Sequence, residues 1–135
     1  MSMVHDNIIK GYDVDFENET LVIKTEYNIT RPKVVHEETD IVFRGYLTHT
    51  FYLPMKNSVI FDTYELSIGQ FLKNEREVLM LGKNSCWPIH YENIEELSCF
   101  LHNNSYMVFI VGSSYGLNGW VIAKSMEIVT ESLIT

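Results

Sequence analysis

The chain has 135 residues, of which 46% are hydrophobic and 13% aromatic, and its formal net charge is −8. This length predicts one domain, residues 1–135, with enough surface to bury a hydrophobic core, and the composition excludes intrinsic disorder. No apolar run reaches the roughly 18 residues that span a bilayer, so we expect neither a membrane segment nor a signal peptide. Eighteen acidic residues against ten basic ones disfavour nucleic-acid binding and favour a basic protein partner.

The first half of the chain has the two-residue periodicity of β-strands. The first two predicted strands are separated by a short polar turn and form a hairpin. Residues 28–38 are polar and contain Pro32, which predicts a loop. In the long third strand, alternate residues from Ile41 to Leu53 are expected to share one face, and Gly45 marks a candidate bulge. The four predicted strands are 8–16, 21–27, 40–53 and 58–65.

The periodicity then changes to that of amphipathic helices. Ser67, with Gln70 three residues later, is a typical capping-box start, and a helical apolar stripe follows it as far as Gly82. Asn93 is expected to cap a second helix, whose first turn carries glutamates that the helix dipole favours. Two further strands are predicted, 106–111 and 120–129, with a glycine-rich connection, 112–119, between them.

This order of elements, ββββ-αα-ββ, predicts an α+β fold. We expect a mostly antiparallel six-stranded sheet with both helices packed on one of its faces. The chain contains two cysteines, Cys86 and Cys99. A single pair in a chain without a predicted signal peptide indicates reduced thiols and a cytoplasmic location.

Residue types used in catalysis and metal binding recur in the second half of the chain. Cys86, His90, Cys99 and His102 are residue types that zinc prefers, but their order and spacing match no usual zinc site, so we expect no metal and no cofactor. The tripeptide 36–38, His-Glu-Glu, lacks the second histidine of a metalloprotease motif and predicts a solvated turn. Cys86 near His90 is the best candidate for a nucleophile and its base, although no known catalytic motif surrounds it.

Acidic residues concentrate in the first hairpin and in the segment that leads into the third strand. They are interleaved with tyrosines, which bring a large apolar contact area at little entropic cost. Such a surface suits contact with lysine and arginine on another protein. We therefore expect the partner-binding residues to be Asp13, Asp15, Glu17, Glu19, Glu37, Glu38 and Asp40.

One segment of the chain carries a family resemblance. Residues 113–125, SSYGLNGWVIAKS, preceded by the predicted helix 93–101, resemble the C-terminal half of small bacterial proteins. Some of these are similar to immunity proteins of polymorphic or contact-dependent-inhibition toxin systems. The resemblance implies a cytoplasmic, non-catalytic protein that neutralises one cognate toxin. Immunity proteins against nucleases are often acidic, because the nuclease site that they cover is basic, so the implied partner is a basic nuclease toxin.

Two other functions fit the same sequence. An acidic secretion or assembly chaperone is one, and a clear dimer in solution would favour it over the monomer or weak dimer that we expect. A small enzyme that uses Cys86 and His90 is the other; a depressed thiol pKa in a concave pocket would favour it.

Overall fold

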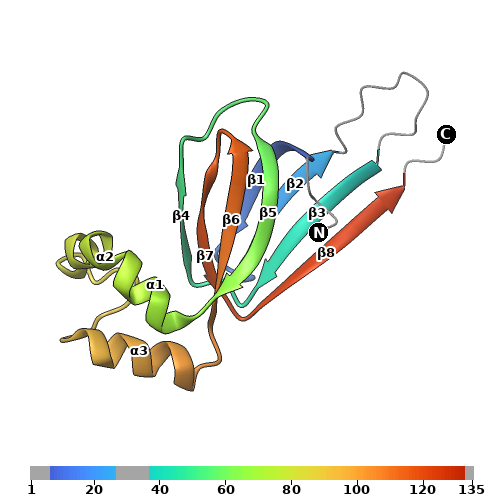
Figure 1. The fold of residues 1–135 in the computed structure, drawn as a ribbon. Helices are drawn as coiled ribbons and strands as arrows, with labels where there is room; N and C mark the ends of the chain where they lie inside the picture. The colour runs from blue at the N-terminus through green and yellow to red at the C-terminus, as the bar shows by residue number, and fades with distance from the viewer. Residues whose placement is uncertain (1–6, 27–36, 133–135) are drawn as a thin grey trace.

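The computed structural model describes residues 7–26 and 37–132 (Figure 1). Figure 1 shows the helices gathered at one end of the molecule, while β3 and β8 extend away from them. The elements in chain order are β1 (Ile8–Asp15), β2 (Thr20–Glu26), β3 (Glu37–Arg44), β4 (Thr48–Tyr52), β5 (Val59–Leu66), α1 (Ile68–Asn74), α2 (Arg76–Lys83), α3 (Ile94–Asn103), β6 (Met107–Tyr115), β7 (Asn118–Ala123) and β8 (Ser125–Ser132).

The strands form one sheet in the order β4-β7-β6-β5-β1-β2-β3-β8, with antiparallel neighbours throughout. β5 and β1 meet at a short junction, where the N–H of Ile9 donates to the carbonyl of Ser58 at 2.8 Å and Ile8 pairs with Val59. This junction divides the sheet into two parts. We call β4-β7-β6-β5 the helix-side half and β1-β2-β3-β8 the far half.

A bent two-stranded ribbon joins the halves at their other ends. β3 pairs with β8 and β4 with β7, and between these ladders Lys124 N–H donates to Arg44 O and Leu47 N–H donates to Ile122 O, each at 2.9 Å. Gly45 lies at the bend with a φ of +67°, a conformation that favours glycine. The bend turns the halves toward each other, and Phe43 packs on Phe109 with ring centroids 5.7 Å apart. They enclose one apolar cluster, which includes Ile9, Leu21, Ile23, Ile41, Phe43, Ile60, Phe109, Val111, Leu117 and Val121.

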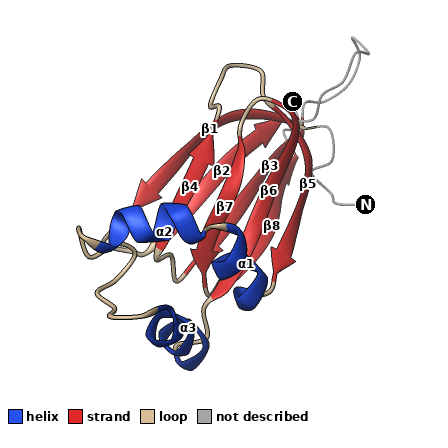
Figure 2. Cartoon of the chain, turned by 60° about the vertical axis from the view of Figure 1, so that its left-hand side comes forward, coloured by secondary structure: helices blue, strands red, loops and turns tan. Residues whose placement is uncertain are grey.

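The helices cover the other side of the helix-side half (Figure 2). Their buried residues, among them Phe71 and Leu97, pack on Trp120 and other outward side chains of β6 and β7. Both predicted N-caps are confirmed, because the Ser67 hydroxyl accepts from Gln70 N–H and the Asn93 amide oxygen from Glu96 N–H. None of the helices in the described ranges is long and apolar enough to cross a membrane.

The mixed α/β architecture with an antiparallel sheet is confirmed, but the predicted number of elements is wrong. The described part of the chain has eight strands rather than six and three helices rather than two. The predicted strand 40–53 is divided around Gly45 into β3 and β4, and the predicted strand 120–129 is divided at Lys124 between β7 and β8. The first predicted helix is divided at Glu75 into α1 and α2. The two strand divisions lie where the chain passes from one half of the sheet to the other, and the local periodicity does not record this change. The two helix segments on either side of Glu75 pack in the same cluster.

Three local predictions also need correction. Residues 112–119 are largely strand, because β6 runs to Tyr115 and β7 begins at Asn118. Leu47 packs in the cluster beneath the helices instead of sharing the face of Ile41, since the bend reverses the alternation there. The predicted loop 28–38 lies mostly outside the described residues, and its last two residues, Glu37 and Glu38, begin β3 rather than forming a turn.

Candidate interaction surface

The far half presents one face to the core and leaves the other uncovered by the helices. In β2 and β3 the inward residues, such as Ile23 and Ile41, are fully buried, whereas the residues between them are half-buried or exposed. This alternation follows from the strand geometry, which turns successive side chains to opposite faces. We call the outward side the far face; its charged residues with described side chains include Asp13, Asp15, Lys24, Glu26, Glu38, Asp40, Arg44 and Glu127.

The strand register determines which side chains are neighbours on this face. Directly paired residues of antiparallel strands lie on the same side and close together. One row across the far half contains Asp13, Val22, Val42 and Glu127. The next row contains Lys24, Asp40 and Val129. The three valines are half-buried, so the face combines carboxylates with a short apolar centre.

The basic residues of the far face each lie beside a carboxylate. Lys24 Nζ is 4.0 Å from Asp13 Oδ2, and Arg44 Nη1 is 2.5 Å from Glu127 Oε2. Within the described ranges, neither Glu38 nor Asp40 has an ion-pair partner. The face therefore has a surplus of negative charge, concentrated on β3.

The turn of the β1–β2 hairpin adjoins the far face and adds further carboxylates. Asp15 has a local structural role, since its two oxygens accept from the backbone and side-chain N–H groups of Asn18 at 3.1 and 2.7 Å. The same bonds lower the pKa of Asp15. Glu17 and Glu19 are exposed in this turn, and Phe16 beside them is 78% exposed. Phe16 is thus an apolar side chain at the border of an acidic surface.

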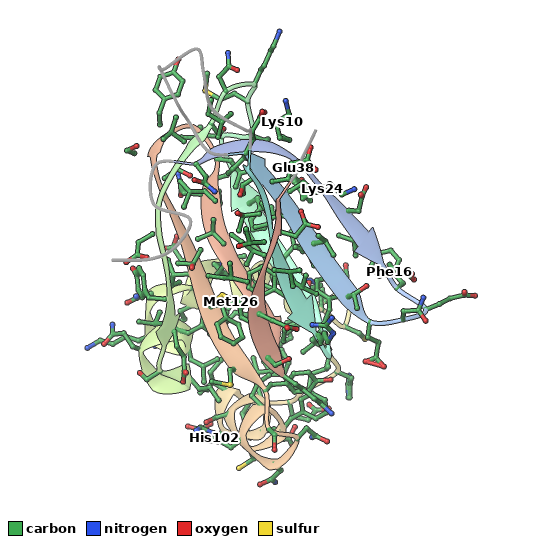
Figure 3. All side chains as sticks on the ribbon, turned by 90° about the vertical axis from the view of Figure 1, so that its right-hand side faces the viewer. Lys10, Phe16, Lys24, Glu38, His102 and Met126 are labelled. Carbon is green, nitrogen blue, oxygen red and sulfur yellow. The ribbon has the colours of Figure 1, made fainter. Side chains whose placement is uncertain are left out.

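The structure places most of the predicted binding residues on one side of the molecule. Asp13, Asp15, Glu38 and Asp40 lie on the far face, and Glu17 and Glu19 lie in the adjoining turn; the side chain of Glu37 lies outside the described residues. Figure 3 shows Glu38 and Lys24 near one end of the far half and Phe16 at the tip of the hairpin. Sequence reasoning missed Glu26 and Glu127. Glu127 reaches this face through the β3–β8 pairing, 83 residues from its partner Arg44, and no local pattern signals that.

The size of the far face limits what it can bind by itself. Four strands of about eight residues, with spacings of roughly 4.8 Å between strands and 3.3 Å along them, give an area of roughly 500 Å². A stable protein interface covers about 800 Å² on each partner. A partner that uses the far face must therefore also contact adjoining surface, and the hairpin turn with the exposed Phe16 is one such region.

The four zinc-type residues of the sequence do not form one site. Cys86 Sγ lies 3.9 Å from His90 Nδ1, and both side chains are exposed. Cys99 and His102 lie on α3, where His102 Nδ1 donates to the carbonyl of Ser98 at 2.8 Å. Nowhere in residues 7–26 and 37–132 do three His, Cys, Asp or Glu side chains converge as a metal site requires.

Another histidine, His49, lies between the two halves of the sheet. The ring of His49 on β4 contacts Tyr12 and Phe51, and its Nδ1 is 2.7 Å from the hydroxyl of Tyr46. Burial lowers the pKa of His49, which favours the neutral imidazole. A neutral ring with its proton on Nε2 accepts the Tyr46 O–H at Nδ1, so this cluster closes the curled sheet by packing and a hydrogen bond.

Comparisons of the chain with known proteins found no match. No family model matches the chain, and no curated protein or solved structure matches it either. The far face, with its unpaired carboxylates and apolar border, is therefore the feature from which a function is proposed.

Proposed function

We propose that the protein is a non-catalytic, immunity-type inhibitor that binds a basic toxin domain, a nuclease, and covers its active-site surface with the far face. The observation that carries the proposal is the surplus of carboxylates on a sheet face that the helices leave uncovered. The family resemblance of residues 113–125 and the net charge of −8 agree with it. The cytoplasm, where such a toxin would act, is the proposed location.

The charges and the apolar groups of this surface would act at different stages of binding. A negative surface attracts a basic partner over a distance of about one Debye length, roughly 8 Å at physiological salt, and so accelerates association. Buried aromatic anchors supply most of the affinity in protein interfaces. Phe16 is the exposed aromatic side chain placed to serve as such an anchor, while Glu38 and Asp40 provide unpaired negative charge.

The test compares two charge-reversed variants against the basic toxin domain encoded by the adjacent gene. The first variant combines Glu38→Lys and Asp40→Lys on the far face. The control combines Glu65→Lys and Glu77→Lys, two exposed acids outside the far face. Each double substitution adds four units of charge to −8, so both variants have a formal net charge of −4.

Association rates at low and high salt distinguish the outcomes. We expect the far-face variant to associate about tenfold more slowly at low salt, with a smaller difference at high salt, and the control to stay near the wild-type rate. Cells that express the toxin should lose protection with the first variant alone. Equal slowing of both variants would show that the association rate depends on the net charge of the protein and not on the far face. Unchanged rates for both variants would show that the interface lies elsewhere.

A further inference from the structure

A hollow of about 450 Å³ opens where β1 separates from β5. The register of β1 against β2 shifts between Ile9 and Gly11, and this bulge increases the bend of the strand. β1 pairs with β5 at Ile8 but diverges beyond it. The segment between β4 and β5, residues 53–58, forms the facing wall through Met55 and Lys56. The hollow is therefore the open end of the space between the two halves.

The floor and lip of the hollow are apolar. Ile9 and Leu117, which line it, belong to the buried cluster between the halves and are 8% and 3% exposed. Met55 at the lip is 47% exposed, and Leu53 just before it is 70% exposed. Apolar side chains thus continue from the core to the protein surface here, as is common in small-molecule sites at the mouth of a curled sheet.

The rim of the hollow carries two lysines, Lys10 and Lys56, and one carboxylate, Glu26, so it is more basic than the rest of this acidic chain. Lys10 Nζ lies 3.1 Å from Glu26 Oε2, so the charge of Lys10 is partly balanced. Lys56 is exposed and has no ion-pair partner among the residues described. An anionic group at the rim would find an ammonium group there while its apolar part contacts Ile9 and Leu117.

We propose that this hollow binds a linear aliphatic chain with one anionic head group, of the class of medium-chain carboxylates. The volume lies at the lower end of the range of roughly 300–1,000 Å³ that small-molecule sites occupy. The aliphatic chain would lie against the apolar floor and the carboxylate beside Lys56. The hollow shares Glu26 with the far face but includes neither Glu38 nor Asp40, the two carboxylates on which the toxin-binding test relies, so the two proposals are tested independently.

Calorimetric titration with dodecanoate, below its micelle concentration, tests the proposal. We expect one dodecanoate per chain. Decanoate should bind about fifteenfold more weakly, because each buried methylene strengthens binding about fourfold. The cation dodecyltrimethylammonium should bind at least tenfold more weakly than dodecanoate. Lys56→Glu should weaken dodecanoate binding about fivefold, the size expected for reversing an exposed charge interaction.

Two glycines provide a matched pair of variants. Gly11 lines this hollow, Gly69 lines a different one between α1 and α3, and a Cβ added at either position would meet nothing within 4 Å. Gly11 pairs with Lys24, so a leucine there would lie on the outward side of the wall and narrow the mouth of the hollow. Gly11→Leu should therefore weaken dodecanoate binding at least tenfold, whereas Gly69→Leu should leave binding unchanged. Thermal melts of both variants verify that they fold.

Three results would overturn the proposal. The first is the absence of any dodecanoate binding by the wild-type chain. The second is unchanged binding by folded Gly11→Leu, or an equal loss in Gly69→Leu, since either places the ligand elsewhere. The third is equal affinity for dodecanoate and dodecyltrimethylammonium, which would show that the lysines do not select the head group.

Discussion

Replacing Gly45 with alanine tests the bend that brings the two halves of the sheet together. Gly45 has a φ of +67°, and an ideal Cβ built on it would lie 2.7 Å from Cβ and 2.6 Å from Cγ of Lys124. The left-handed conformation costs a non-glycine residue about 1–2 kcal/mol. Because Cβ of Lys124 is fixed to the backbone between β7 and β8, no change of rotamer relieves that contact.

The two effects together predict a loss of about 2–3 kcal/mol in unfolding free energy, with the steric part similar to a mild overpacking of the core. Unfolding entropy of about 2.1 cal/mol/K per residue gives roughly 0.28 kcal/mol/K for this chain, so the melting temperature should fall by about 7–11 °C. Urea denaturation followed by tryptophan fluorescence measures the free energy directly, since Trp120 is 1% exposed in the folded protein.

Gly11→Ala is the control, because Gly11 also lies in the sheet but a Cβ there meets nothing within 4 Å. We expect this variant to be neutral or up to about 1 kcal/mol more stable, since glycine in a strand has the larger conformational entropy to lose. An unchanged denaturation midpoint for Gly45→Ala would refute the role of glycine in the bend. Equal destabilisation of both variants would show that loss of any sheet glycine matters, not the bend.

Three further predictions follow from single contacts. The free energy of unfolding should fall as the pH drops below about 6.5, because burial lowers the pKa of His49 and the unfolded chain therefore binds the proton first. The urea denaturation midpoint, measured against pH for wild type and for His49→Gln, checks this: the variant should lose the pH dependence that His49 causes. Asn93→Ala should lose about 1 kcal/mol of unfolding free energy, measured by urea denaturation, because Glu96 N–H loses its cap. Reductant should leave the melting temperature unchanged, because Cys86 and Cys99 are both free and exposed.

Local features of the structure were predictable because their causes are local. A helix N-cap needs a short polar side chain within three residues of the N–H groups that it accepts, and both Ser67 and Asn93 fulfil that role. The two-residue periodicity that predicted the strand 21–27 is local in the same way, and in the structure Leu21 and Ile23 lie on the buried side of β2.

The sequence pattern did not show that the strand passes from one half of the sheet to the other at Gly45, because odd-numbered residues on both sides of the bend face the same cluster, although Leu47 departs from the pattern. Ile41 and Phe43 before the bend, and Phe51 after it, all contact the cluster between the halves. A sequence pattern records which face a residue uses but not the direction of the strand in space. That direction depends on the pairing of β3–β4 with β7–β8, about 80 residues further along the chain.

The acidic residues of the proposed interface were equivalent in the sequence and are unequal in the structure. Asp15 accepts two hydrogen bonds within its own turn, so its replacement changes the hairpin as well as the charge. Asp13 lies beside Lys24, which offsets part of its field. Glu38 and Asp40 have neither kind of partner within the described ranges, and β3 holds both between β2 and β8. Attraction of a basic partner therefore depends more on these two carboxylates than on the larger number in the hairpin, and for that reason the charge-reversal test uses them.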